Sequence, residues 1–275
     1  VIQMTSINTN VGALNARSSA VRATSSMETA MERLSSGLRI NSASDDAAGL
    51  AVAGKMESQL RGINMSIRNA QDGVGLIQTG ESGLNEIRNM VLRIRELAVQ
   101  MANGIYEDTP DRSNAQLEVA ALLEQVDLIA ENTRFNDVAL LDGTMQNVGI
   151  QTGPTANERP SIFFKDNSSS GLGIDTVDVS TQANAKTAMV TLETALTSIS
   201  DELSRAGAYE NRFNHTISVL EQTTKATKIA RGRIMDADIA EESTKLSKAQ
   251  VLSQANTAML AQANQSMSTL LSLFN

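Results

Sequence analysis

Residues 246–275, which read LSKAQVLSQANTAMLAQANQSMSTLLSLFN, decide how this chain folds. One set of positions recurs every three or four residues, the spacing of a single contact line along a helix. We call this set the C-terminal seam: Leu246, Ala249, Ser253, Asn256, Leu260, Ala263, Met267, Leu270 and Phe274. No charged residue follows Lys248, and the opposite face is rich in Gln, Asn, Ser and Thr, which cost less to bury than charges. The stretch therefore predicts a helix that is buried on most of its sides.

The same periodicity is also typical of a helix in an ordinary core, and it does not distinguish packing within a chain from packing between chains. A membrane span needs about 20 consecutive apolar residues, and polar residues interrupt every such run here. A helix lying on a membrane surface favours Lys, Arg and Trp at its edges, and the sequence contains no Trp. We therefore expect a partner helix and no membrane.

A second contact line begins near the N-terminus, where the first 27 residues carry only two charges, Arg17 and Arg22. Its small side chains allow two helices to approach closely, so we expect it to face the C-terminal seam. We call it the N-terminal seam: Ala13, Ala16, Ala20, Ala23, Met27, Ala30 and Leu34. A contact lined by alanine buries little apolar area, at roughly 25 cal/mol per Å². The two ends should be marginal alone, and further burial must come from elsewhere.

Between the seams, the sequence predicts long helices that no proline interrupts, because all three prolines lie between the patterned segments. Pairing the first helix with the last, and the second with the second-last, gives a mainly α fold. We expect a long antiparallel bundle of coiled-coil rods with a small β-hairpin region at its tip. Apolar repeats cover 56–101, 115–129 and 183–227, breaks fall at 38–49 and 229–238, and strand-like pieces occur at 148–150, 162–164 and 172–174. The predicted domains are 1–43, 44–182, 183–230 and 231–275.

The composition argues against catalysis and against nucleic-acid binding. The net charge is −8, the chain has one His and no Cys, and no acidic cluster lies outside helix termini. Asp45 and Asp46 are better placed to cap a helix than to act as a carboxylate pair. The glycines between Gly73 and Gly83 lack the spacing of a phosphate loop, so close packing explains them better. We expect no enzyme activity, no cofactor and no metal.

Several short motifs follow one another along the chain. They are Ser6–Asn10 (SINTN), Ala13–Asn15 (ALN), Leu34–Asn41 (LSSGLRIN), Asp45–Gly49 (DDAAG), Ala70–Gly73 (AQDG), Arg95–Gln100 (RELAVQ), Thr133–Asn136 (TRFN), Arg233–Asp238 (RIMDAD) and Leu260–Asn264 (LAQAN). Through these motifs, in this order, nearly the whole chain resembles bacterial flagellin. The middle, roughly 145–182, stands where many flagellins carry large outer domains. The sequence therefore resembles a short form that lacks them.

The resemblance implies a structural subunit that polymerises with copies of itself into an extracellular filament for swimming. The paired ends would form its inner tube, and flagellar junction and cap proteins would be further partners. A related filament-junction protein is the alternative. The resemblance also implies an export chaperone bound to residues 246–274, export without a Sec-type signal peptide, and a surface sensed by Toll-like receptor 5 at Arg93, Leu97 and Glu118.

Overall fold

The structure is a computed structural model that describes residues 9–145, 147–153, 155 and 157–273, with side chains as far as residue 269. The chain divides into two compact units. The first unit combines the residues up to 58 with those from 226 onward, and the second comprises residues 59–225. The compact units divide inside two long helices, which contribute residues to both. The domain bounds 1–43, 44–182, 183–230 and 231–275 stay a prediction.

Five long helices make up most of the part of the chain that the structure describes: α1 (Val11–Ser36), α2 (Ala47–Met101), α3 (Ser113–Asn132), α4 (Gln182–Met235) and α5 (Ile239–Leu273). A short π-helical turn, η1 (Asp108–Arg112), precedes α3. The lengths of α2 and α4, 55 and 54 residues, are possible because proline is absent from 1–109 and from 161–275. A small slip in the apolar repeat near residue 80 does not interrupt α2.

Two short antiparallel pairs lie between α3 and α4: β1 (Arg134–Phe135) with β2 (Val138–Ala139), and β3 (Val148–Gly149) with β4 (Ser161–Ile162). The second pair overlaps two of the predicted strand-like pieces, 148–150 and 162–164. The third predicted piece, 172–174, is a turn, in which Ile174 N donates to Ser169 O at 2.8 Å. The β1–β2 hairpin was not predicted. Its turn residues, Asn136 and Asp137, have φ of 49° and 63°, as two-residue hairpin turns require.

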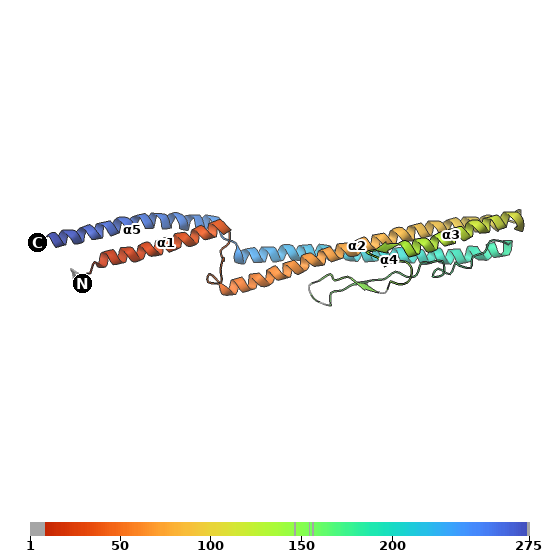
Figure 1. Ribbon diagram of the computed structural model, residues 1–275, viewed down its shortest axis with the longest axis horizontal. Helices are drawn as coiled ribbons and strands as arrows, with labels where there is room; N and C mark the ends of the chain where they lie inside the picture. The colour runs from red at the N-terminus through yellow and green to blue at the C-terminus, as the bar shows by residue number, and fades with distance from the viewer. Residues whose placement is uncertain (1–8, 146, 154, 156, 274–275) are drawn as a thin grey trace. The chain divides into compact units, whose positions relative to one another are not determined.

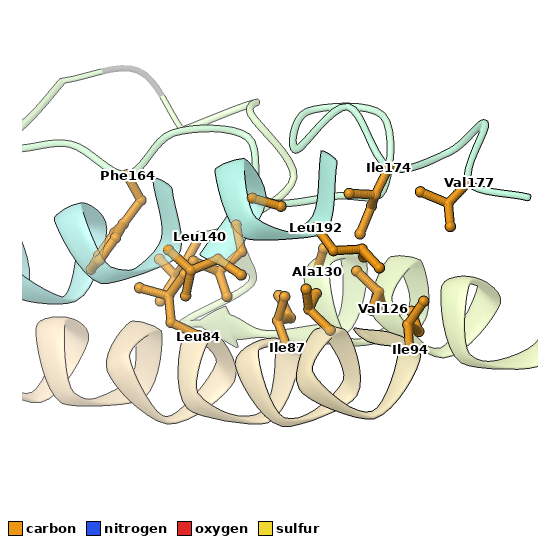
Figure 2. Close-up of a cluster of buried hydrophobic side chains, with 14 of the residues drawn as sticks. Leu84, Ile87, Ile94, Val126, Ala130, Leu140, Phe164, Ile174, Val177 and Leu192 are labelled. Atoms are coloured by element: carbon orange, nitrogen blue, oxygen red, sulfur yellow. The ribbon is translucent and has the colours of Figure 1, made fainter. Parts of the chain in front are cut away.

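The core of the second unit forms where α2, α3 and α4 meet, as Figure 2 shows. Ile87, Val126 and Leu192, one from each helix, are fully buried. Burying such a side chain contributes roughly 1.5–3 kcal/mol relative to leaving it exposed. At the surface, Arg95 Nη2 on α2 lies 2.6 Å from Glu193 Oε2 on α4. The predicted pairing of the second long helix with the second-last is confirmed.

The segment between α3 and α4 completes this core. Leu140, Phe164 and Ile174 point from it into the same apolar cluster (Figure 2). A Cβ at Gly80 would lie 2.7 Å from Phe164 Cζ, so this glycine makes room for the ring. The β-hairpin region was expected at the tip, but it lies along α2 and α4 (Figure 1), because its apolar side chains are buried only against the bundle.

We expect Leu84→Ala to lower the free energy of unfolding of the second unit by about 2–5 kcal/mol, because Leu84 is completely buried in this core. Leu117→Ala on α3 is the matched control. The Leu117 side chain is 69% exposed, so the change should stay within about 0.5 kcal/mol. Urea unfolding followed by circular dichroism measures both, and equal effects would contradict this core.

Candidate assembly surface

The N-terminal and C-terminal seams face each other in the first unit. Helices α1 and α5 lie side by side and antiparallel (Figure 1). Asn10 Nδ2 donates to Ala263 O at 3.0 Å, and toward the other end of α1 Arg33 Nη1 lies 3.4 Å from Glu242 Oε1. The predicted pairing of the first helix with the last is confirmed.

Every seam residue whose side chain the structure describes is at least partly buried. On α1 these are Ala13, Ala16, Ala20, Ala23, Met27, Ala30 and Leu34. On α5 they are Leu246, Ala249, Ser253, Asn256, Leu260, Ala263 and Met267. The side chain of Leu270 and the whole of Phe274 lie outside the described residues. The three-and-four spacing thus identifies the faces through which the two helices touch.

The contact between α1 and α5 is nevertheless small. Its fully buried apolar positions are alanines, with Ala23, Ala30 and Ala249 only 6%, 2% and 3% exposed. Larger apolar side chains on both helices point outward and are 45–64% exposed: Val11, Leu14, Val21, Met31, Val251, Leu252 and Met259. Stabilisation grows with the apolar area removed from water. Covering these exposed side chains would therefore add to the free energy of unfolding of the two helices.

A groove runs along one side of the α1–α5 pair. It consists of two hollows, of about 740 and 500 Å³, and Ser19 and Asn256 line both of them. The larger hollow carries four basic residues and one acid: Arg22, Arg33, Lys245, Lys248 and Glu242. Its floor includes the buried alanines of the seams. The groove therefore presents a narrow apolar floor with a positively charged border.

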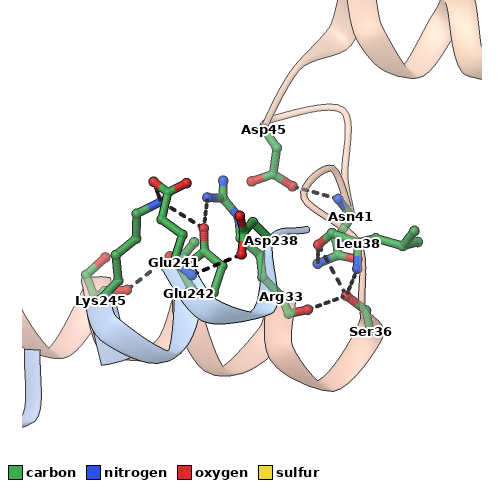
Figure 3. A network of polar contacts seen from close by, with 11 residues as sticks. Arg33, Ser36, Leu38, Asn41, Asp45, Asp238, Glu241, Glu242 and Lys245 are labelled. Atoms are coloured by element: carbon green, nitrogen blue, oxygen red, sulfur yellow. Dashed lines mark hydrogen bonds and ion pairs between the residues drawn. The ribbon is translucent and has the colours of Figure 1, made fainter. Parts of the chain in front are cut away.

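Glu242 lies between two of these cations, as Figure 3 shows. Its Oε1 accepts a hydrogen bond from Lys245 Nζ at 2.9 Å and lies 3.4 Å from Arg33 Nη1. The hydrogen bond from Lys245 and the two positive charges hold the pKa of the Glu242 carboxyl below its ordinary value of 4.5, against the effect of burial. Sequence reasoning missed this cluster, although the i, i+3 spacing of Glu242 and Lys245 was a usable signal.

The two breaks in the helical pattern are hydrogen-bonded to each other in the first unit. Arg39 N donates to Met235 O at 2.6 Å, and Ala237 N donates to Gly37 O at 3.0 Å. Gly37 ends α1 with φ of 70°, a conformation that favours glycine. The second break was predicted over 229–238, but α4 continues to Met235, because residues 229–235 are mostly good helix formers that outweigh one glycine.

Carboxylates hold the helix starts that follow each break. Asp46 Oδ1 accepts from Gly49 N at 2.8 Å at the start of α2, and Asp238 Oδ1 accepts from Ala240 N at 2.9 Å at the start of α5. Asp45 Oδ2 accepts from the main chain of Asn41 and Ser42, and the Ser42 contacts do most to lower the pKa of Asp45 (Figure 3). Of the two acids predicted as caps, Asp46 therefore caps α2, whereas Asp45 binds the main chain of the break that precedes it.

The candidate receptor surface lies in the second unit. Arg93 Nη2 on α2 lies 2.8 Å from Glu118 Oε1 on α3, and both side chains are about half exposed. The hydrogen bond from Arg93 to Glu118 is the largest cause of a raised Arg93 pKa. Leu97 is only 5% exposed and belongs to the core of this unit. Of the three predicted residues, Arg93 and Glu118 are therefore the ones whose side chains are exposed at the surface.

Within the described part of the chain, no group of three His, Cys, Asp or Glu side chains could hold a metal ion. The same residues include no helix that is both long and apolar enough to cross a membrane. The single histidine, His215, is exposed on α4. The surface of interest is thus the α1–α5 pair with its groove, its outward apolar side chains and its linked breaks.

Two family regions match this chain. Residues 7–146 match the bacterial flagellin N-terminal helical region, and residues 189–274 match the bacterial flagellin C-terminal helical region. The flagellin of Halalkalibacterium halodurans is 39% identical over 97% of this chain and 98% of its own length. A flagellar filament core protein of Brachyspira hyodysenteriae is 40% identical over 94% of this chain and 95% of its own length.

Solved structures give a consistent result. The crystal structure of Bacillus cereus flagellin covers 55% of this chain and 88% of its own, with 31% identity and a TM-score of 0.50. A structure of a flagellar hook-associated protein from Vibrio parahaemolyticus covers 70% of this chain and 100% of its own, with a TM-score of 0.60. At 12% identity, this second likeness concerns the fold alone.

We expect acid to weaken the α1–α5 pair through Glu242. Its pKa in the folded chain is lowered, so its stabilising contribution is present above its ordinary value of 4.5 and is lost as the pH falls through the lowered value. Glu242→Gln should reduce amide-exchange protection of residues 243–250 at neutral pH and flatten its decline in acid. Glu28→Gln, an exposed change on α1, is the control, and identical pH curves for wild type and Glu242→Gln would contradict this role.

Proposed function

This chain belongs to the bacterial flagellin family, and we infer from that membership how its terminal helices are used. It is a structural subunit of the bacterial flagellar filament, the polymer used for swimming. Relatives that match over almost their whole length share its short form. We propose that the filament is extracellular and that the α1–α5 pair joins neighbouring subunits within it.

The burial of the two helices is the observation that carries this proposal. Within one chain, α1 and α5 bury mainly alanine, while Val21, Val251 and Met259 are more than 60% exposed. Packing against other subunits would cover these side chains and fill the groove. On α1, the exposed Leu14 and Val21 do not line the groove, whereas on α5 Leu252 and Met259 do. The α1–α5 pair thus offers two unlike surfaces, and contacts between unlike surfaces generate open polymers rather than closed dimers. The seam residues would then set the register of each pair in the inner tube.

A junction protein is the alternative that the sequence left open. Relatives named as flagellin or filament core protein match over nearly their full length, and this favours the filament itself. The likeness to a hook-associated protein supports only a shared fold. We therefore propose junction and cap proteins as partners at the two ends of the polymer and not as relatives in function.

Polymerisation tests the proposed function directly. Purified chain added to short filament seeds should form long filaments, visible by electron microscopy. Ala249→Glu should block growth, because it places a charge at a position that is 3% exposed between α1 and α5. The melting of the second unit serves as the folding control, since residue 249 lies outside that unit. Normal filaments from Ala249→Glu would reject the seam, and a wild-type chain that never polymerises would reject the function.

We propose that an export chaperone holds residues 246–274 before assembly. In a lone chain this helix gains little from its alanine contact, so its outward apolar side chains are available to a partner that covers them. A chain truncated after residue 245 should lose the complex with the flagellin chaperone in size-exclusion chromatography. The variant Val190→Ala, which removes an exposed apolar side chain of the second unit, should keep it. A complex that survives the truncation would reject this partner.

We propose that Toll-like receptor 5 contacts the surface around Arg93 and Glu118. Both side chains are accessible and form one ion pair, so reversing the charge of Arg93 removes a cation and separates the pair. A monomeric Arg93→Asp chain should signal less in receptor-bearing cells than wild type. Arg134→Asp, an exposed change elsewhere in the same unit, is the control. Unchanged signalling by Arg93→Asp would reject this surface.

A further inference from the structure

Asn103 and Gly104 form the only Asn-Gly pair in the sequence, and both are exposed in the connection between α2 and α3. The main-chain nitrogen that follows an asparagine can attack its side-chain amide, and glycine at that position offers no side chain to hinder the attack. Two hydrogen bonds in this connection favour the reaction. We propose that Asn103 is a site of spontaneous deamidation that the fold itself promotes.

The first hydrogen bond activates the attacking nitrogen. Arg112 Nη2 donates to Asn103 O at 2.8 Å, and this oxygen belongs to the peptide group that contains Gly104 N. When that N–H loses its proton, negative charge spreads onto the same oxygen, where the guanidinium stabilises it. The position of the Arg112 guanidinium is fixed by two further hydrogen bonds, to Met101 O at 2.9 Å and to Asp108 Oδ1 at 2.7 Å. The residue is only 4% exposed.

The second hydrogen bond prepares the group that is attacked. Ile105 N donates to Asn103 Oδ1 at 3.3 Å. This contact holds the Asn103 side chain to the main chain of the second residue after it, across Gly104. It also places a donor on the oxygen that becomes negative as the tetrahedral intermediate forms. A nucleophile and an oxyanion donor therefore flank one asparagine.

The reaction needs only water as a second reactant. Gly104 N, after giving its proton to solvent, forms a bond to Asn103 Cγ. The bond from Cγ to the side-chain nitrogen breaks, and that nitrogen takes one proton from solvent and leaves as ammonia. Water then opens the five-membered succinimide at either carbonyl and leaves aspartate or isoaspartate. Because Asn103 is exposed, water can reach the ring.

Both products change the electrostatics of the connection. Each adds a carboxylate at position 103, close to the guanidinium that already pairs with Asp108. Isoaspartate also adds one methylene to the main chain between residues 103 and 104. We therefore expect Arg112 to lose its present contact with the carbonyl of residue 103 when isoaspartate forms, and the connection between α2 and α3 to rearrange.

The test follows Asn103 in the intact chain. Folded chain, urea-unfolded chain and a synthetic peptide of residues 98–108 are incubated at the same neutral pH, digested and analysed by mass spectrometry for aspartate and isoaspartate. The folded chain should convert about tenfold faster than the peptide, the effect of one well-made hydrogen bond on a rate. Asn136, exposed in the β1–β2 turn, is the internal control. A folded chain that converts more slowly than the peptide overturns the proposal.

Two variants separate the contributions. Gly104→Ala should slow conversion in chain and peptide alike, because it hinders the attack itself. Arg112→Lys should remove the advantage of the folded chain, since one ammonium cannot reach all three acceptors. Arg134→Lys, an exposed change at a side chain that donates to Glu131 O, should leave the rate unchanged. A rate in Arg112→Lys equal to wild type, with helix content intact, would overturn the role of Arg112.

Discussion

The alanine contact between α1 and α5 is the constraint on which the rest of the first unit depends. Small side chains let the two helices approach closely, but they remove little apolar area from water. Ala23 and Ala249 are almost fully buried, and yet Val21 and Val251 on the same helices are largely exposed. Close packing of small side chains fixes the register of the two helices, but it contributes little to the free energy of unfolding of the pair. This combination is what the assembly proposed for the α1–α5 pair requires.

The second unit is built differently and completes its own core. Large side chains from α2, α3 and α4 fill it, and the segment between α3 and α4 covers it. Two acids hold this segment in place. Glu202 Oε1 accepts from Lys165 N at 2.8 Å, and Asp127 accepts from Ser169 N at 2.7 Å. The chain thus combines a unit that buries its large apolar side chains with a helix pair that leaves several of them exposed.

Repeating patterns made most of the helical architecture predictable from sequence. The seams located the faces of α1 and α5 because helix period and burial are directly linked. The β1–β2 hairpin was missed because its two-residue strands are too short to show an alternation of apolar and polar residues. The sequence signal for this hairpin is the turn pair Asn136 and Asp137. The burial of Leu97 was also missed at the candidate receptor surface, since a motif identifies residues but not which of them face the core.

The main-chain hydrogen bonds between Gly37, Arg39, Met235 and Ala237 have a practical consequence for anyone who mutates this protein. Every residue except proline has both a main-chain donor and a main-chain acceptor. These hydrogen bonds between the two breaks should therefore persist through most side-chain substitutions. Proline at position 39 or 237 would remove a main-chain donor outright, whereas Arg39→Ala would keep the main-chain donor and remove only the side-chain hydrogen bond to Ile234 O. A proline scan, rather than an alanine scan, is therefore the way to map the hydrogen bonds that connect the two breaks.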